Sequence, residues 1–275
     1  MIRHKLRSYI RYPIYTDAVN WFDQLALKLG TGGIIYCYVC GNIGLTRVSD
    51  RNLRENCFCI NCGSSNRQRQ IAYVICKTMT LERNRRVGSL RDLRKFTDLS
   101  LYNTESTAAL HQSLLGVKNY QFSEYYGPKY KSGDRVNNII HQDLMSLSYE
   151  DSSFNLVISS DVFEHLPDPY KAHKEIHRVL KPKGRHIFTV PFLQSEFLDE
   201  CRAFIDDSGK QILLKEPIYH GDPLRPEGVL VYRHFSLEML LELRKIGFRT
   251  NLYHLYRPIY GILGTNATVF EAIKD

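Results

Sequence analysis

The hydrophobic positions that follow residue 97 alternate between two spacings along the chain. Short apolar runs are typical of buried strands, and apolar positions that recur every three or four residues are typical of amphipathic helices. Strands that alternate with helices in this way predict an α/β fold with a doubly wound sheet. The strands are predicted at 98–102, 119–124, 136–143, 154–161, 185–192, 250–256 and 266–274, and the helices at 106–116, 169–180 and 237–248.

The first third of the chain has a different pattern. One amphipathic helix is predicted at 17–29, and a second at 64–77, where Ser64 or Ser65 can serve as the N-cap. Residues 82–95 are highly charged and are predicted to connect this region with the α/β domain.

Two parts of the chain are therefore expected. Residues 1–95 form a small N-terminal module, and residues 96–275 form the α/β domain. Within the second part, the segment 193–235 separates the fifth strand from the last helix and is predicted to be an insertion, with a hairpin at 202–214.

Cysteines are concentrated in the N-terminal module, where five of the seven lie between positions 37 and 62. Four of them form two Cys-x-x-Cys-Gly pairs, and the 18 residues between the pairs match the spacing of paired zinc knuckles. Four thiolates leave no open coordination position, so a structural zinc ion is expected. A disulfide or a redox-active pair fits a doubled motif less well. The predicted ligands are Cys37, Cys40, Cys59 and Cys62, with Cys57 as an alternative to Cys59.

The net charge of +8 is concentrated in the same region. Residues 1–100 hold 17 Lys and Arg against 7 Asp and Glu, a balance of +10, so the remainder of the chain carries −2. Such a basic region either meets a polyanion such as nucleic acid or provides a soluble surface. Arg67 and Arg69 lie in the first turns of a predicted helix, where the helix dipole disfavours cations. They indicate either an anionic contact or a salt bridge within the module.

Neither a membrane span nor a signal peptide is predicted. No apolar run approaches the roughly 18 residues that a transmembrane helix needs, and no apolar stretch follows the basic N-terminus. The expected location is the cytoplasm, without a membrane partner.

Polar side chains gather where the strand predicted at 154–161 ends. Ser160 and Asp161 close this strand, and Glu164 and His165 follow before the next helix begins. Because open α/β sheets bind their ligands at the carboxyl ends of the strands, we expect these side chains to face a ligand.

The clearest resemblance to a known family lies in residues 141–192, HQDLMSLSYEDSSFNLVISSDVFEHLPDPYKAHKEIHRVLKPKGRHIFTVPF. This run resembles the second half of a class I S-adenosylmethionine (SAM)-dependent methyltransferase of the small-molecule branch. With the cysteine pairs and YHGDP at 219–223, the chain is also similar to bacterial methyltransferases that carry an N-terminal zinc ribbon. The resemblance covers about residues 37–273 and implies a Rossmann-like sheet of seven strands. It also implies that the insertion at 193–235 is a lid over the methyl acceptor.

The resemblance implies a set of SAM-binding residues. In this family, the acidic residue that ends the second strand binds the ribose hydroxyls, which implies Glu124. The Asp after the third strand lies by the adenine, which implies Asp143 with Leu144 beside it. The end of the fourth strand lines the methyl-transfer centre, which implies Ser160 on the cofactor side.

The loop after the first strand departs from the family pattern, because LYNTEST (101–107) contains no glycine. A dinucleotide needs glycine so that the backbone can approach its pyrophosphate, so an NAD-linked oxidoreductase is disfavoured. SAM has no phosphate. Its ammonium needs an acidic partner, which Glu105 can supply, and its carboxylate needs a donor, which Thr104 can supply. A degenerate domain that no longer binds SAM remains the alternative.

The acceptor site is predicted between the strand end and the insertion. The strand end supplies Asp161 and His165, and the insertion supplies His220 and Asp222, unless YHGDP is only a surface turn. Either histidine can act as a base near neutral pH.

The expected function is methyl transfer from SAM to an oxygen, nitrogen or carbon atom of a small molecule, such as a carbohydrate or another metabolite. One alternative is an RNA methyltransferase that docks nucleic acid through its basic N-terminal third. The other is a zinc-ribbon binding protein with a degenerate methyltransferase domain. The sequence leaves the oligomeric state open.

Overall fold

The centre of the molecule is a mixed sheet of eight strands. The computed structural model describes residues 17–222, 225–264 and 266–275, with the backbone alone for 17–20. Five neighbouring strands are parallel, and the strand next to them is antiparallel to both of its neighbours. In spatial order the strands are β16 (Phe248–His254), β17 (Thr268–Lys274), β9 (Leu180–Thr189), β8 (Phe154–Ser160), β4 (Ser100–Asn103), β5 (Asn119–Glu124), β7 (Ile139–His141) and β6 (Arg135–Val136).

The prediction of a single strand at 136–143 is wrong, and it accounts for the eighth strand. The chain turns back at Asn137 and Asn138, whose φ angles are 50° and 65°. Val136 pairs with Ile139 across this two-residue turn. Asparagine tolerates the left-handed region that such a hairpin turn requires, so β6 and β7 form a short hairpin at the sheet edge.

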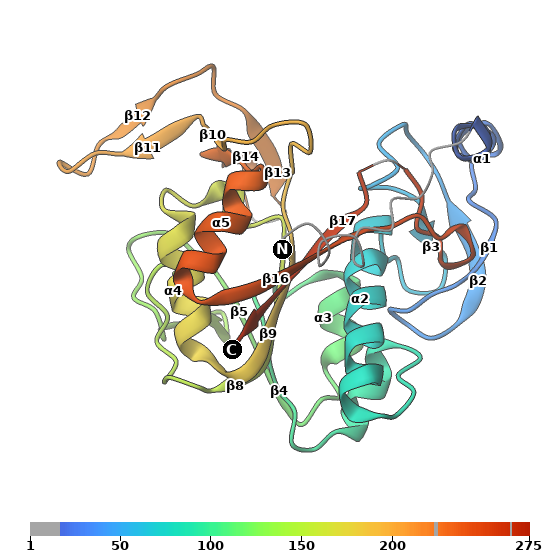
Figure 1. Cartoon of the computed structure of the whole chain (residues 1–275), viewed down its shortest axis with the longest axis horizontal. Helices are drawn as coiled ribbons and strands as arrows, with labels where there is room; N and C mark the ends of the chain where they lie inside the picture. Colours follow the sequence, from blue (N-terminus) through green and yellow to red (C-terminus); the bar gives the residue numbers. More distant parts are fainter. Residues whose placement is uncertain (1–16, 223–224, 265) are drawn as a thin grey trace, which may run out of the picture.

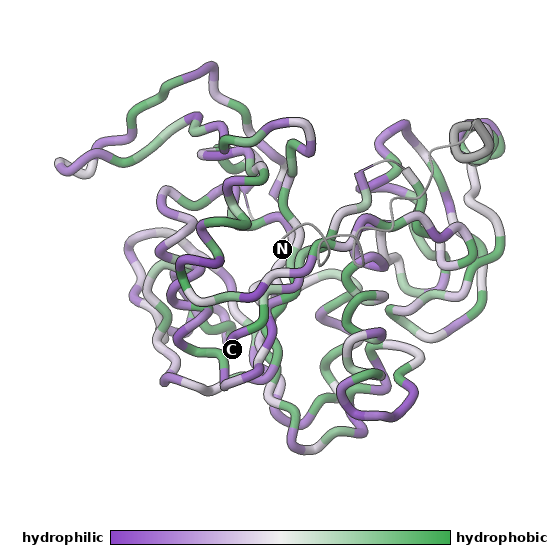
Figure 2. The backbone as a smooth tube through the Cα atoms, in the orientation of Figure 1, coloured by the Kyte–Doolittle hydropathy of each residue, from purple (hydrophilic) through white to green (hydrophobic). Residues whose placement is uncertain are grey.

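Two pairs of helices cover the two faces of the sheet (Figure 1). Helices α4 (Pro169–Val179) and α5 (Leu237–Ile246) pack on one face, and α2 (Asn66–Arg83) and α3 (Ala108–Leu114) on the other. Asp168 caps α4 through its side chain, and Pro169 opens the helix. Figure 2 shows hydrophobic residues along the central strands, which these helices shield from water.

Helix α2 ties the N-terminal module to the sheet. Ser65 caps it in a capping box with Gln68, which confirms one of the two predicted caps. Ile71 and Ile75 on this helix belong to the same hydrophobic cluster as Ile158 on β8. The hydrophobic core is therefore continuous across residue 95.

The remaining elements lie in the module, in the connections and in the insertion. The module contains α1 (Asp17–Leu29), β1 (Ile34–Tyr36), β2 (Ile43–Arg47) and β3 (Phe58–Cys59), and the connections contain three 3₁₀ turns, η2 (Leu90–Lys95), η3 (Phe163–His165) and η4 (Pro258–Tyr260). The insertion contains β10 (Glu200–Cys201), β11 (Ala203–Ile205), β12 (Gln211–Leu213), β13 (Tyr219–Asp222), β14 (Arg225–Leu230) and β15 (Arg233–His234).

Three antiparallel pairs organise the insertion. The hairpin predicted at 202–214 is confirmed by the pairing of β11 with β12. The residues of YHGDP up to Asp222 form strand β13, not a loop, and β13 pairs with β14. Pro223 lies outside the described residues.

The part of the chain that the structure describes contains no helix long and apolar enough to cross a membrane.

Candidate active site and cysteine cluster

A cavity of about 840 Å³ lies at the carboxyl ends of β4, β5, β8 and β9. Its wall has three sources: the strand ends, the insertion through β13, and the N-terminal module through the start of α2 and the loop before it. This is the edge where an open α/β sheet binds its ligands.

Four of the six predicted SAM-binding residues line the cavity. They are Thr104, Glu105, Glu124 and Ser160. Asp143 and Leu144 do not line it: the Asp143 carboxylate accepts a hydrogen bond from the Met145 amide and so closes the turn after β7, and Leu144 is buried in the core.

Glu124 sits at the end of β5 and is held from the neighbouring loop. The amide and the hydroxyl of Ser106 both donate to Glu124 Oε1, at 2.8 and 2.9 Å. Burial raises the pKa of Glu124, and the two bonds from Ser106 partly oppose this rise. The carboxylate is therefore fixed in position at the cavity wall.

The loop after β4 presents buried polar atoms that have no partner among the described residues. They are Glu105 Oε1 and Thr104 Oγ1. Burial raises the pKa of Glu105 to about 7, although the charge of Arg67 opposes this rise. Unpaired buried polar groups are costly, and the ammonium and carboxylate of a SAM molecule would satisfy these two. The residues present thus fit SAM.

Asp161, at the end of β8, is held by two arginines of the N-terminal module. Arg54 forms a bidentate pair with its carboxylate, at 2.5 and 2.7 Å, and Arg67 approaches it to 3.5 Å. Burial alone would raise the pKa of Asp161, but the charges of Arg67 and Arg54 hold it well below its usual range. Asp161 is thus a permanent anion, unsuited to taking up a proton near neutral pH.

The sequence left open whether Arg67 makes a salt bridge within the module or a contact outside it, and the structure shows both. It pairs with Glu55 within the module at 2.7 Å, and it donates to Ser160 Oγ across the cavity edge at 2.7 Å. Arg69 has a different environment, because its guanidinium donates to the backbone carbonyls of Cys57 and Gly261.

The acceptor side of the cavity contains the predicted histidines. His165 lies on η3 and His220 on β13, and their rings meet edge to face with centroids 5.1 Å apart. Asp222 also lines the cavity and pairs with Arg225 at 2.7 Å. The structure therefore brings His165, His220, Asp161 and Asp222 to one cavity.

Sequence reasoning missed the contribution of the N-terminal module. It was also wrong to expect Glu164 to face the ligand, because Glu164 is fully buried and does not line the cavity. Arg54 and Asp161 are 107 positions apart, and no local pattern connects them. The only indication of this contact in the sequence was Arg67, a cation in the first turns of a predicted helix.

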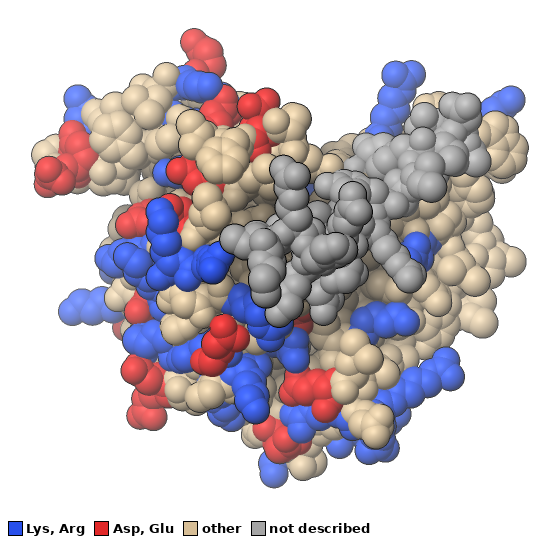
Figure 3. Space-filling view, viewed as in Figure 1, with Lys and Arg blue, Asp and Glu red and all other residues tan. Residues whose placement is uncertain are grey.

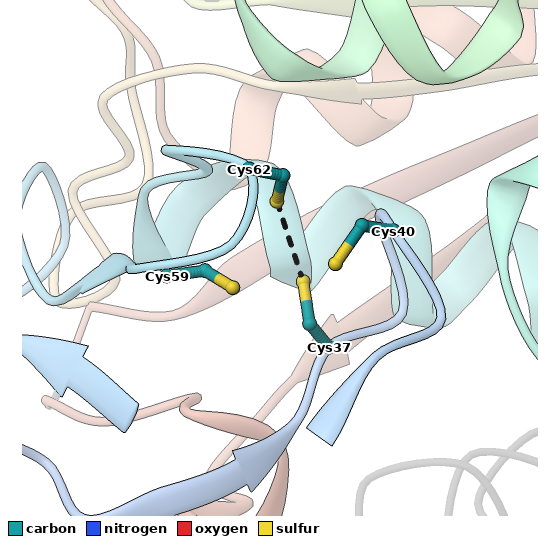
Figure 4. Close-up of side chains that lie close together, drawn as sticks. All are labelled: Cys37, Cys40, Cys59 and Cys62. Carbon is teal, nitrogen blue, oxygen red and sulfur yellow. Dashed lines mark hydrogen bonds between the residues drawn. The ribbon is translucent and has the colours of Figure 1, made fainter. Parts of the chain in front are cut away.

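The four predicted zinc ligands point toward one another (Figure 4). The sulfurs of Cys37, Cys40, Cys59 and Cys62 all lie within 4.8 Å of one another, and those of Cys37 and Cys62 are 3.8 Å apart. A zinc ion with Zn–S bonds of about 2.3 Å would place its sulfurs about 3.8 Å apart. The cluster thus has the size of a tetrahedral zinc site, and all four thiols are free.

Local backbone geometry builds this cluster from the two glycine-ended pairs. The amides of Gly41 and Gly63 each donate to the carbonyl of the first cysteine of the pair, both at 2.8 Å. Their φ angles of 79° and 69° lie in the left-handed region, where glycine carries no steric penalty. Cys57 lies outside the cluster, in a separate hydrophobic group with Ala26 and Val48, so Cys59 is the better ligand.

Comparisons with known proteins find methyltransferases. Residues 106–188 match a family model described as a methyltransferase domain. Cycloartenol-C-24-methyltransferase of Arabidopsis thaliana is 39% identical over 91 residues, which cover 33% of this chain and 25% of that protein. Sterol 24-C-methyltransferase erg6 of Aspergillus fumigatus is 24% identical over 183 residues, covering 63% and 43% of the two chains. The chain thus spans less than half of these curated relatives.

One solved structure aligns with a larger share of the chain, at low similarity. An S-adenosylmethionine-dependent methyltransferase from Mesorhizobium loti aligns with a TM-score of 0.41 and 15% identity, covering 68% of this chain and 99% of that one.

Residues 106–188 thus match a methyltransferase domain, and they lie within the eight-stranded α/β sheet. This domain match agrees with the enzyme class expected from the sequence.

Proposed function

We propose that this protein transfers a methyl group from SAM to an oxygen or nitrogen atom of a small molecule. The observation that carries the proposal is one cavity that joins two sets of residues. Glu105 and Glu124 lie on the side of the first two strands, and His165 and His220 lie on the side of the insertion. Its volume of about 840 Å³ falls in the range of about 300–1,000 Å³ that is typical of small-ligand sites.

The reaction is an in-line displacement at the methyl carbon. The acceptor atom forms the new bond to carbon, the carbon–sulfur bond breaks, and its electron pair stays on sulfur to give neutral S-adenosylhomocysteine. The acceptor loses a proton, and His165 and His220, which line the cavity on this side, are the candidate bases. Positioning of the two reactants supplies most of the rate enhancement.

Three arginines of the N-terminal module are used inside the protein and do not add to a nucleic-acid surface. Arg54, Arg67 and Arg69 are turned inward to carboxylates and carbonyls, so they are not available to phosphates. On the face shown in Figure 3, Lys and Arg lie beside Asp and Glu around α4, without a continuous basic stripe. Nucleic-acid binding relies on such a stripe.

Radiolabelled SAM tests this proposal. Incubation of the full chain with SAM labelled in the methyl group should label a component of a small-metabolite extract. Labelling confined to an RNA fraction would favour the RNA alternative.

Glu124→Ala is expected to weaken SAM binding by about 1.5–3 kcal/mol, because a charge-assisted pair of hydrogen bonds to the ribose is lost. Calorimetry with SAM measures the change. Glu150→Ala, on an exposed turn after β7, is the matched control and should bind as the wild type does. Equal affinity in Glu124→Ala would remove this residue from the cofactor site.

SAM binding is expected to strengthen as the pH rises through about 7, the pKa of Glu105 in the free protein. Below this pH the carboxyl is neutral and must release a proton before it can pair with the SAM ammonium. Each pH unit below the pKa therefore costs up to about tenfold in affinity. Binding isotherms between pH 5.5 and 8 measure this slope. In Glu105→Gln the slope should flatten, and an unchanged slope would assign it to another group.

We infer that the cysteine cluster holds one structural Zn²⁺. Cys59→Ser should lower the bound zinc by one equivalent per chain, whereas Cys57→Ser should leave it unchanged. Metal analysis of the purified proteins decides this, with Cys201→Ser as a control outside both groups. The reverse result for Cys57 and Cys59 would exchange their roles.

A further inference from the structure

Behind the acceptor side of the cavity lies a buried carboxylate that no hydrogen bond satisfies. The Glu164 side chain has 0% exposure, and neither of its oxygens has a hydrogen-bond partner among the described residues. A bare carboxylate in the interior costs several kcal/mol unless a cation compensates it. The nearest partners are His165 Nε2 and His220 Nδ1, each 3.7 Å from Glu164 Oε1. This separation is too long for a hydrogen bond.

His165 is already oriented with a free nitrogen toward this carboxylate. Its Nδ1 lies 2.8 Å from the carbonyl oxygen of Leu230. A carbonyl can only accept, so Nδ1 carries the hydrogen and Nε2 has the lone pair in the neutral ring. A hydrogen bond from one ring nitrogen to a carbonyl is the usual arrangement behind a histidine that ligates a metal through the other.

His220 completes a triad from a different element. It lies on β13 in the insertion, whereas Glu164 and His165 lie on η3 after β8. The three candidate ligand atoms all lie within 4.8 Å of one another. Ligands about 2.1 Å from a tetrahedral ion are about 3.4 Å apart, so the observed 3.7 Å needs only a small contraction.

The arginines near Glu164 are already paired with other carboxylates. Arg54 and Arg67 carry two positive charges, and Glu55 and Asp161 carry two negative charges in direct contact with them. These four groups cancel, which leaves one carboxylate and two histidines to receive a cation.

We propose that Glu164, His165 and His220 bind a divalent first-row transition ion, separate from the cysteine cluster. Two imidazoles and one carboxylate are the ligands such ions take when coordination positions stay open to a substrate. His165 and His220 both line the cavity, so the open positions face it.

Such an ion would restrict which methyl acceptors can bind, and this inference rests on the proposed function. An ion with open positions at the acceptor side favours a molecule with two adjacent oxygens, as in a vicinal diol, a catechol or a 2-hydroxy acid. Coordination lowers the pKa of a hydroxyl, so the acceptor would ionise near neutral pH.

Cobalt titration of the full chain, loaded with one zinc per chain to fill the cysteine cluster, tests the metal site without SAM. The wild type should bind one Co²⁺ per chain, without the intense thiolate-to-cobalt absorption that the cysteine cluster would give. His220→Ala should weaken this binding by about tenfold or more, and Glu164→Gln should do the same. His177→Ala, which removes a histidine on α4 outside the cavity, should bind cobalt as the wild type does.

Two results would overturn the proposal. One is that the chain binds no cobalt once zinc fills the cysteine cluster, and the other is that wild type and His220→Ala bind cobalt with equal affinity. His220 is partly exposed on a hairpin, so this variant stays informative if Glu164→Gln does not fold. Because neither SAM nor turnover enters the measurement, its failure leaves the methyltransferase proposal standing. Conversely, cobalt binding without any SAM binding would contradict only the methyltransferase proposal.

Discussion

Asp161→Ala is expected to lower the free energy of unfolding by about 3–5 kcal/mol, because it leaves two inward-facing arginines without their shared carboxylate. The side chains of Arg54 and Asp161 are only 10% and 15% exposed. Asp161 also occupies the left-handed region, with a φ angle of 51°. The ion pair therefore holds a strained strand end against the N-terminal module. Urea unfolding followed by circular dichroism measures the change.

Asp98→Ala is the matched control for this prediction. Asp98 pairs with Arg83 at 2.6 Å, but its side chain is 65% exposed, so its loss should cost less than about 1 kcal/mol. If Asp161→Ala does not fold, the double variant with Arg54→Met tests the same contact, because removing both charges should restore part of the stability. Equal losses for Asp161 and Asp98 would mean that the module does not pair with the strand end.

The pKa of Asp161 predicts the pH range over which the ion pair stabilises the fold. The pKa in the folded state lies well below the usual value for Asp, so the contribution is complete above about pH 5. It is lost as the pH falls from there toward the folded-state pKa.

His220→Ala is expected to reduce methyl transfer by about 10²–10⁴-fold while SAM affinity changes little. His220 lies on the insertion side of the cavity, away from Glu105 and Glu124 at the first two strand ends. The loss is expected whether the imidazole takes the acceptor proton or helps to hold an ion that activates it. Methyl transfer and SAM calorimetry on the same preparations separate the two effects, and His165→Ala should behave alike.

His177→Ala again serves as the control, with activity expected at the wild-type level. Loss of SAM binding in a folded His220→Ala protein would move this residue to the cofactor side. Wild-type turnover in both His165→Ala and His220→Ala would leave the histidine pair without a role in the reaction.

The sheet could be predicted because its signals are local. The buried run at β8 and the cap and proline that open α4 are each encoded within a few residues. The hairpin turn at Asn137–Asn138 was missed although asparagine pairs are typical of such turns. The apolar residues on both sides gave the segment the appearance of one strand.

Part of the site was predicted from the positions of strand ends. Glu124 and Ser160 end strands, and ligands of such sheets bind there. The contact of Arg54 with Asp161 depends on how α2 packs on the sheet, which no short pattern specifies. The role of Glu164 depends on its burial between two histidines from different elements, and the sequence shows only one of them beside it.

Calorimetric titration of the full, zinc-loaded chain with SAM tests the central claim most directly. The account predicts saturable binding of one SAM per chain at pH 8, weaker binding at pH 6, and a further loss in Glu124→Ala. A folded, zinc-loaded protein that shows no binding at any pH in this range would contradict it and would identify the domain as a methyltransferase fold that has lost its cofactor.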